Sequence, residues 1–216
     1  GIEACAAGVT ENDVAAELHR AQIKAGSEYT GLPAFLRTGA RDAQTHAAWN
    51  RNVLEPGDSV TFETPGCINR YHATLYGQVF IGDPPAALLR GMEIGNEIMR
   101  KTKAAIRPGV PAGDIHAFVQ RSLEEAVGPE SRRNSRAAYS IGIAFAPDWG
   151  EGQILSMTHG EKRPLAAGMT FHLLAGHVFL HGMERVKRSC CSDTILVTED
   201  GCETLTDGVE HKAYAK

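Results

Sequence analysis

The sequence predicts an α+β fold made of two similar halves, each with helices followed by strands that enter a sheet. Two weak internal repeats occur in the same order along the chain. Residues 8–14 and 109–115 both open a helix with Gly-Val, and residues 54–57 and 165–168 both run from a Leu to a Gly before an apolar strand. Segments that recur in one order indicate duplication. Two packed halves are expected to leave a cleft between them, where small molecules bind.

The composition is that of an ordinary globular protein. With 216 residues the chain is long enough to bury a full core, and we treat residues 1–216 as one domain. The formal net charge of -4 provides no basic field for nucleic acid and no polybasic patch for a membrane surface. No apolar run approaches the length of a membrane-spanning helix. Five cysteines without a CxxC pair predict free thiols and a cytoplasmic protein.

The first residues suggest that the chain is part of a larger protein. Residues 1–8 have the composition of the end of a helix that is already under way. We therefore expect this chain to be the carboxy-terminal catalytic domain of a longer protein, with an amino-terminal domain that is absent from it.

The first half is expected to begin with a helix. Thr10 and Asp13 form a capping box, and apolar residues follow at helical spacing until Gly26. Residues 28–41 then predict a loop and a short strand. The turn-rich residues 38–42 lead to His46.

A predicted hairpin over residues 60–82 is the centre of the first half. An apolar run delivers Glu63, residues 65–66 are a Pro-Gly turn, and the chain returns through residues 70–72 to a second apolar run. Charged side chains are rarely buried without a partner, so several of them in one hairpin predict a pocket. The alternative is a rim of solvated charges on a half-exposed sheet.

The second half is expected to contain two helices and several strands. A long helix over residues 83–106 ends at an Arg-Pro-Gly break, and a second helix spans residues 114–127. The predicted strands are residues 138–145, 169–180, 192–198 and 202–205.

The order of these motifs resembles the pita-bread family of M24-type proteins. The matching segments are residues 8–11, His46, residues 54–58, the hairpin at Tyr71, and residues 107–109, 168–169 and 197–201. This family holds methionine and Xaa-Pro aminopeptidases, prolidases, creatinases and ectoine hydrolases. The resemblance covers nearly the whole chain and implies duplicated helix-and-strand halves around a curved sheet.

The resemblance also implies that the metal site of the family's peptidases is lost. Those enzymes bind two metal ions through two Asp, one His and two Glu, an oxygen-rich set suited to hard divalent ions. Their positions fall here at Glu63, Thr74, Tyr139, Leu174 and Ser192, with Asp193 one residue away. One or two carboxylates cannot hold two metals, so we expect no metal, no cofactor and no metallopeptidase activity.

Within the family the chain is most similar to ectoine hydrolases. The similarity rests on residues 63–67, 70–72, 139–145, 146–152 and 171–173. It implies a metal-independent hydrolase that opens the cyclic amidine of ectoine to N-acetyl-diaminobutyrate. It also implies a homodimer in which one subunit's amino-terminal domain covers its partner's pocket. The chain departs from this group at residues 76–78, where an Arg-Thr pair is common, so an Arg contact is missing.

Glu63 and His46 are the expected catalytic residues. Glu63 can pair with the amidinium by charge-assisted hydrogen bonds, or it can attack the amidine carbon. The alternative is a structural Glu paired with Arg70. His46, at the position of the creatinase acid and base, would protonate the leaving ring nitrogen and help to activate water. Its alternative is a loop His bonded to the backbone.

Other side chains are expected to bind the substrate. They are Tyr71, His72, Tyr139, Trp149, Glu151 and His172. Tyr71 and His72 are neighbours on a strand, so they point to opposite faces and cannot both line one pocket from the same face. Tyr139 would occupy the emptied metal region, and Trp149 could stack on an amidinium. Packing in the core is the alternative for Tyr139, Trp149 and His172.

Two other functions remain open. A creatinase-like amidinohydrolase could act on another guanidine or amidine. A non-catalytic pita-bread module could bind a histone or RNA, as relatives without metals do. The second is disfavoured because the chain has neither a basic patch nor an acidic tail, and because it keeps His46 and Glu63.

Overall fold

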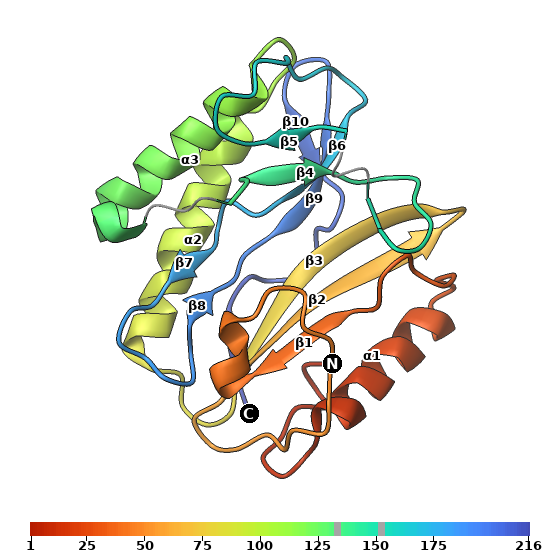
Figure 1. Cartoon of the computed structure of the whole chain (residues 1–216), viewed down its shortest axis with the longest axis vertical. Helices are drawn as coiled ribbons and strands as arrows, with labels where there is room; N and C mark the ends of the chain where they lie inside the picture. The colour runs from red at the N-terminus through yellow and green to blue at the C-terminus, as the bar shows by residue number, and fades with distance from the viewer. Residues whose placement is uncertain (132–134, 151–153) are drawn as a thin grey trace.

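The computed structural model describes residues 1–131, 135–150 and 154–216, and these form two packed sheets with helices on their outer sides (Figure 1). One sheet has the strand order β1-β2-β3-β11 and the other β10-β9-β6-β4-β5, and a small ribbon pairs β7 with β8. Strand β3 contacts both β9 and β6, so the two sheets meet along the hairpin. This arrangement confirms the predicted fold class.

The first half contains one helix and the sheet around the hairpin. Its elements are α1 (Glu11–Lys24), β1 (Phe35–Thr38), η1 (Gly39–Ala43), β2 (Ser59–Ile68) and β3 (Tyr71–Phe80), joined at the end of the chain by β11 (Ala213–Ala215). The predicted capping box at Thr10 and Asp13 is present. Helix α1 buries Val14 and Leu18 against apolar residues of β1, β2 and β3.

The second half places two long helices on the other sheet. Its elements are α2 (Ala86–Ala105), α3 (Ala112–Val127), η2 (Pro129–Ser131), β4 (Ala138–Ser140), β5 (Ser156–Met157), β6 (Thr170–Leu173), β7 (Val178–Phe179), β8 (Arg188–Ser189), β9 (Asp193–Val197) and β10 (Cys202–Thr204). In Figure 1, α2 and α3 lie together along one side of the molecule, away from α1. Their apolar faces and the central strands β4, β6 and β9 form one core.

The two halves share the same local contacts. The amide of Gly8 donates to the carbonyl of Leu54 and the amide of Gly109 to that of Leu165, each at 2.9 Å. The amides of Leu54 and Leu165 donate back to the residue after each glycine, at 2.8 Å. Equivalent residues therefore tie each helix start to its strand, as a duplicated unit requires.

The hairpin turn lies later than the sequence predicts. Strand β2 continues through residues 65–66, and the chain reverses at Asn69 and Arg70, whose φ angles are 50° and 66°. Two consecutive positive φ angles are typical of a tight hairpin turn that matches the strand twist. Pro65 is accommodated in the strand although it has no amide to donate, because the carbonyl of its partner Thr74 accepts from the Thr194 hydroxyl at 2.9 Å.

Two other expectations are wrong. Residues 1–8 form turns rather than the end of a helix. The strand expected over residues 138–145 stops at Ser140, because the following residues leave their sheet and meet the hairpin. Ile143 pairs with Tyr71 in an isolated bridge, and the Gly142 carbonyl accepts a hydrogen bond from the His72 amide at 2.9 Å.

Neither the cysteines nor the helices provide further chemistry. All five cysteines are free thiols, as predicted. Burial raises the pKa of Cys190 to about 12, so this thiol stays protonated and unreactive near neutral pH. In the described part of the chain, no helix combines the length and the apolar character needed to cross a membrane.

Gly77 is packed against an aromatic ring, which leads to a stability prediction. Gly77 faces Phe62 across the hairpin, and a Cβ at Gly77 would lie 2.0 Å from the ring. We expect Gly77→Ala to lower the free energy of unfolding by about 1–3 kcal/mol, because the ring must move in a packed core. Denaturant unfolding measures this change. Gly66→Ala in the same hairpin is the control, since a Cβ there meets nothing within 4 Å.

The double variant Phe62→Leu with Gly77→Ala extends this test. Removing the ring should recover most of the loss, which a double-mutant cycle detects as coupling between the two sites. Equal losses in Gly66→Ala and Gly77→Ala, or no coupling to Phe62, would contradict the steric explanation. The same contact leaves no room for a large side chain such as Arg at this position.

Candidate active site

Glu63 is a buried carboxylate held between two tyrosines. It lies in β2 with 3% of its surface exposed, directly across the ladder from Tyr76 in β3. The Tyr76 hydroxyl donates to Glu63 Oε2 at 2.6 Å, and the Tyr139 hydroxyl lies 3.5 Å from Oε1. Burial raises the pKa of Glu63, and the Tyr76 hydrogen bond opposes this rise. A desolvated carboxylate of this kind interacts strongly with a cationic ligand.

A chain of hydrogen bonds lies behind Glu63. The Tyr139 hydroxyl accepts from the Trp149 indole at 2.9 Å and lies 2.8 Å from Nδ1 of His172. The other ring nitrogen of His172 lies 2.8 Å from the Ser192 hydroxyl, which accepts the Tyr76 amide at 3.0 Å. Neighbouring strands position these residues, because Tyr139 in β4 pairs with His172 in β6. The chain of contacts holds the Tyr139 hydroxyl next to Glu63 and ends at the backbone amide of Tyr76.

His172 is a neutral histidine. It is fully buried, and burial lowers its pKa to about 3, an effect that Asp193 opposes electrostatically. Both ring nitrogens are engaged, as a buried imidazole requires. His172 therefore orients Tyr139 rather than exchanging protons with solvent near neutral pH.

The low pKa of His172 predicts an acid-sensitive fold. Between pH 6.5 and about 3, the unfolded chain binds a proton at this histidine and the folded chain does not. Stability from this group is therefore lost as the pH falls below 6.5, by about 1.4 kcal/mol per pH unit. The measurement is the free energy of unfolding of wild type and His172→Gln between pH 7 and about 4.5.

Glu63 acts in the opposite direction in that experiment. Its raised pKa means that the folded state takes up a proton earlier than the unfolded state, which adds stability as the pH falls. The difference between wild type and His172→Gln therefore isolates the histidine, and His181→Gln at an exposed site is the control. Parallel curves for wild type and His172→Gln would contradict the prediction.

A cavity of about 520 Å³ opens in front of Glu63. His46, Glu63, Tyr76, Tyr139 and Arg188 contribute to its wall. The sequence points to Glu63, His46 and Tyr139 as site residues, and all three line this cavity. It misses Tyr76 and Arg188, and also Arg136, which stacks on the Tyr139 ring at 4.1 Å from its centroid.

His46 lies in the loop after η1. Its backbone has a positive φ of 60°, and its ring lies 4.8 Å from that of Phe35. Burial lowers the pKa of His46, and the positive charges of Arg136 and Arg37 add to this effect. Within the described residues, no backbone group hydrogen-bonds to the His46 ring, which disfavours the alternative of a purely structural loop histidine.

Trp149 and His172 lie behind the cavity wall. Trp149 is buried, packs against the Phe35 ring at 4.9 Å between centroids, and donates to Tyr139. These contacts agree with the packing alternative rather than with stacking on a substrate. Glu151 lies outside the described residues.

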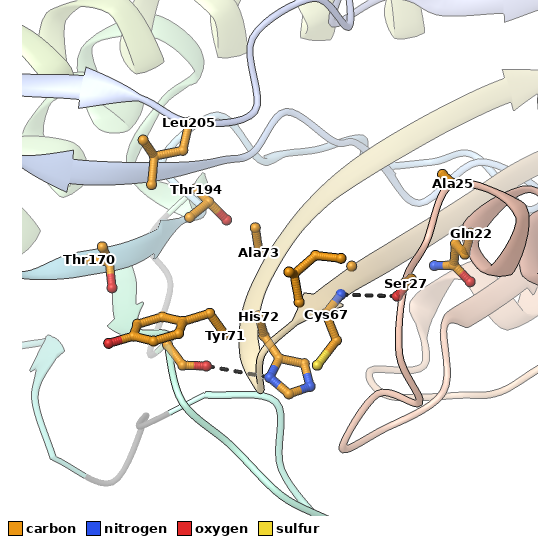
Figure 2. Close-up of a pocket in the computed structure, with 13 residues that line it drawn as sticks. Gln22, Ala25, Ser27, Cys67, Tyr71, His72, Ala73, Thr170, Thr194 and Leu205 are labelled. Atoms are coloured by element: carbon orange, nitrogen blue, oxygen red, sulfur yellow. Dashed lines mark hydrogen bonds between the residues drawn. The ribbon is translucent and has the colours of Figure 1, made fainter.

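Tyr71 and His72 lie away from Glu63, around a second cavity of about 500 Å³ at the tip of the hairpin (Figure 2). His72 is buried, and its Nε2 accepts the Gly31 amide at 3.0 Å, while 60% of the Tyr71 surface is exposed. Both residues line this one cavity, from opposite faces of the strand. The cavity passes the end of the hairpin and is bounded on both sides, by Gln22 on one and Thr194 on the other.

Arg70 is not the partner of Glu63. Its guanidinium lies 3.3 Å from Glu28 and stacks over the Tyr29 ring at 4.0 Å from the centroid. The alternative of a structural Glu63–Arg70 ion pair is therefore wrong.

The residues at the expected metal positions do not fit a pair of divalent ions. Thr74 and Ser192 are neutral hydroxyls in hydrogen bonds, and Leu174 is apolar. Asp193 contacts Lys103 at 2.5 Å and His211 at 3.1 Å, so it does not join Glu63. In the described ranges, no three His, Cys, Asp or Glu side chains gather as metal ligands. Divalent ions of this family need several carboxylates.

Comparisons with known proteins agree with the fold. The model of metallopeptidase family M24 matches residues 2–199. Ectoine hydrolase from Halomonas elongata is 30% identical over 95% of this chain and 52% of its own length. A Xaa-Pro dipeptidase from Pyrococcus furiosus is 23% identical over 95% of this chain and 56% of its own. The chain thus spans about half the length of these curated relatives.

Solved structures give the same result. The X-Pro aminopeptidase from Thermotoga maritima aligns with a TM-score of 0.85 and 20% identity, covering 100% of this chain and 57% of that one. The prolidase from Pyrococcus horikoshii aligns with a TM-score of 0.84 and 20% identity, covering 98% and 58%. These structural similarities show the fold, and the family model matches most of the sequence. The chain belongs to metallopeptidase family M24.

Proposed function

We propose that the protein is a metal-independent hydrolase that opens the cyclic amidine of ectoine to N-acetyl-diaminobutyrate. The observation that carries the proposal is Glu63, a buried carboxylate at a cavity wall, held by tyrosine hydroxyls where the family's peptidases have metal ligands. An amidinium is a planar cation that forms charge-assisted hydrogen bonds with a carboxylate. The similarity to an ectoine hydrolase supports the same substrate class.

The reaction adds water to the amidine carbon and breaks one of its two C–N bonds. That carbon ends as the amide carbonyl, with an oxygen that comes from water directly or by way of Glu63, and the released nitrogen leaves as an ammonium group. The leaving nitrogen already carries one hydrogen in the amidinium, and the two protons of water account for the two hydrogens that it gains. The reaction therefore needs an anion beside the amidinium and a group that carries a proton to the leaving nitrogen.

Glu63 and His46 can supply these two functions. We propose that Glu63 attacks the amidine carbon, forming an ester-like adduct that water resolves. An amidinium beside the carboxylate stabilises its charged form and so offsets the effect of burial on its pKa. His46 lines the same cavity, where its neutral ring would take a proton from the retained nitrogen of the adduct and pass it to the leaving nitrogen. Tyr76 and Tyr139 hold the Glu63 oxygens in place.

The deciding experiment uses the full-length natural protein with a panel of substrates. The panel contains ectoine, other guanidines and amidines, and Xaa-Pro dipeptides, each with a chelator and with added divalent metal. We expect ring opening of ectoine that the chelator leaves unchanged. Activity on another amidine alone would favour the creatinase-like alternative. Dipeptide cleavage that requires metal would refute the proposal in favour of the peptidases of the family.

We also propose that the protein acts as a homodimer, as the resemblance implies. Light scattering of the full-length protein measures this directly. A monomer that retains full activity would contradict it.

A further inference from the structure

Two buried arginines lie together beneath the loop that carries His46. Arg37 in β1 and Arg188 in β8 are 0% and 5% exposed. Arg37 donates to the Gln44 carbonyl at 3.1 Å, and Arg188 lies 3.5 Å from the same oxygen and donates to the Asp42 carbonyl at 2.6 Å. Two guanidinium groups that converge on one carbonyl form a concentrated positive charge inside the protein. We refer to Arg37 and Arg188 as the arginine pair.

The arginine pair is incompletely neutralised. Among the described residues, Nε and Nη2 of Arg37 and Nε of Arg188 have no hydrogen-bond partner, although all three atoms are buried. Asp42 approaches Arg188 only to 3.9 Å, and no carboxylate in the described ranges forms an ion pair with Arg37. Buried donors without partners are costly and uncommon. Such a pair favours an anionic ligand that can accept from several N–H groups at once.

The arginine pair belongs to the same cavity as Glu63. Arg188 lines that cavity, and the Arg37 guanidinium lies 5.6 Å from the centroid of the Tyr76 ring, whose hydroxyl bonds to Glu63. The wall of the cavity thus contains a carboxylate at one point and the Arg188 guanidinium, with Arg37 behind it, at another. This charge distribution is complementary to a small molecule that carries both a cation and an anion.

We propose that Arg188, held in place by Arg37, binds a carboxylate of the substrate while Glu63 binds its amidinium. The inference rests on the proposed function and narrows it to amidines that also carry a carboxylate. It also accounts for the absence of an Arg in β3, at Gly77: the positive charge comes from β1 and β8 instead. A neutral or purely cationic amidine would leave the guanidinium donors unmatched.

The test compares two substrates of the full-length protein. One is ectoine, and the other is the same cyclic amidine ring without its carboxylate. We expect wild type to prefer ectoine through a lower KM. Arg188→Met should raise the KM for ectoine by about 10- to 100-fold, the effect of losing a hydrogen bond to a charged group. The same variant should leave kcat/KM for the ring without a carboxylate within about twofold of wild type.

Control variants separate binding from folding. Arg188→Lys keeps the positive charge but loses the planar fork, so it should fall between wild type and Arg188→Met. Arg185→Met removes a nearby guanidinium that pairs with Glu55 and Asp58, and it should leave the KM for ectoine unchanged. Equal losses for both substrates in Arg188→Met would overturn the proposal, because they would show a structural role.

The outcome also distinguishes this inference from the proposed function. If wild type opens both rings with equal kcat/KM, the carboxylate site is refuted while the proposed hydrolase stands. If wild type opens neither ring, the proposed hydrolase is refuted. Calorimetry with N-acetyl-diaminobutyrate then decides on the site. If wild type binds this compound and Arg188→Met does not, the carboxylate site is supported. If wild type does not bind it, or if Arg188→Met binds it equally well, the carboxylate site is refuted.

Discussion

Replacing Glu63 by Gln is expected to lower kcat for ectoine ring opening by about a thousandfold or more. The substitution keeps the size of the side chain but removes the charge that pairs with the amidinium and the oxygen that attacks it. The Gln carbonyl oxygen can still accept from Tyr76, whose hydroxyl donates to Glu63 at 2.6 Å. Steady-state and single-turnover kinetics on the full-length protein measure the loss.

The fold should survive this substitution. Burial raises the pKa of Glu63, so the charged form is disfavoured by its surroundings in the absence of substrate. A neutral Gln therefore should not lower the free energy of unfolding at pH 7 beyond the loss of one hydrogen bond, about 1 kcal/mol. Glu203→Gln, at an exposed site, is the matched control. Unchanged turnover in Glu63→Gln would reject Glu63 as the central residue.

Labelled water separates the two roles of Glu63. In a single turnover in heavy-oxygen water, an attacking carboxylate keeps one labelled oxygen after its adduct is hydrolysed at the Glu63 carbonyl. Peptide mass spectrometry then finds the label on Glu63. A carboxylate that only binds the amidinium stays unlabelled while the product carries the heavy oxygen. The second result would leave Glu63 essential but would refute an adduct that is hydrolysed at the Glu63 carbonyl.

The hairpin shows how far the sequence determines the site. Its apolar runs correctly predict two strands around Glu63. Placing the turn at Pro65-Gly66 rather than at Asn69-Arg70, however, hides the cross-strand partner, because the turn sets the register. With the actual turn, Glu63 faces Tyr76. The tyrosine that holds the carboxylate could therefore be found from the sequence only after the turn was correctly assigned.

Other site residues depend on contacts that sequence patterns cannot show. Tyr139 and His172 are adjacent because β4 pairs with β6. Arg37 and Arg188 come from strands in different parts of the chain and meet only in the folded protein. For Arg37, the signal in the sequence is a charged residue that follows the apolar residues of β1. Tyr71 and His72 are predicted to bind the substrate because they are neighbours in a motif. The hairpin instead places them at its tip, beside the second cavity.

Replacing His46 by Ala is expected to lower kcat/KM for ectoine by about 100- to 10,000-fold, the usual contribution of a general acid–base group. Because the pKa of His46 is lowered below its ordinary value of 6.5, the ring is neutral at pH 7 and can accept a proton. Wild-type kcat/KM should therefore fall as the pH drops through this lowered pKa. In His46→Ala, the fall in kcat/KM at low pH that comes from protonation of His46 should disappear. Only the fall that comes from protonation of Glu63 should remain.

Added imidazole provides the matching rescue experiment. His46 is exposed to solvent while its ring borders the cavity, so a free imidazole can enter the space that His46→Ala leaves. We expect imidazole to restore part of the activity in the variant and to have no effect on wild type. The restored rate should follow the neutral form of imidazole, because the missing group acts first as a proton acceptor. If kcat/KM of the variant falls at low pH as in wild type, the proton transfer belongs to another group of the cavity. The same conclusion follows if imidazole restores no activity although the variant is folded.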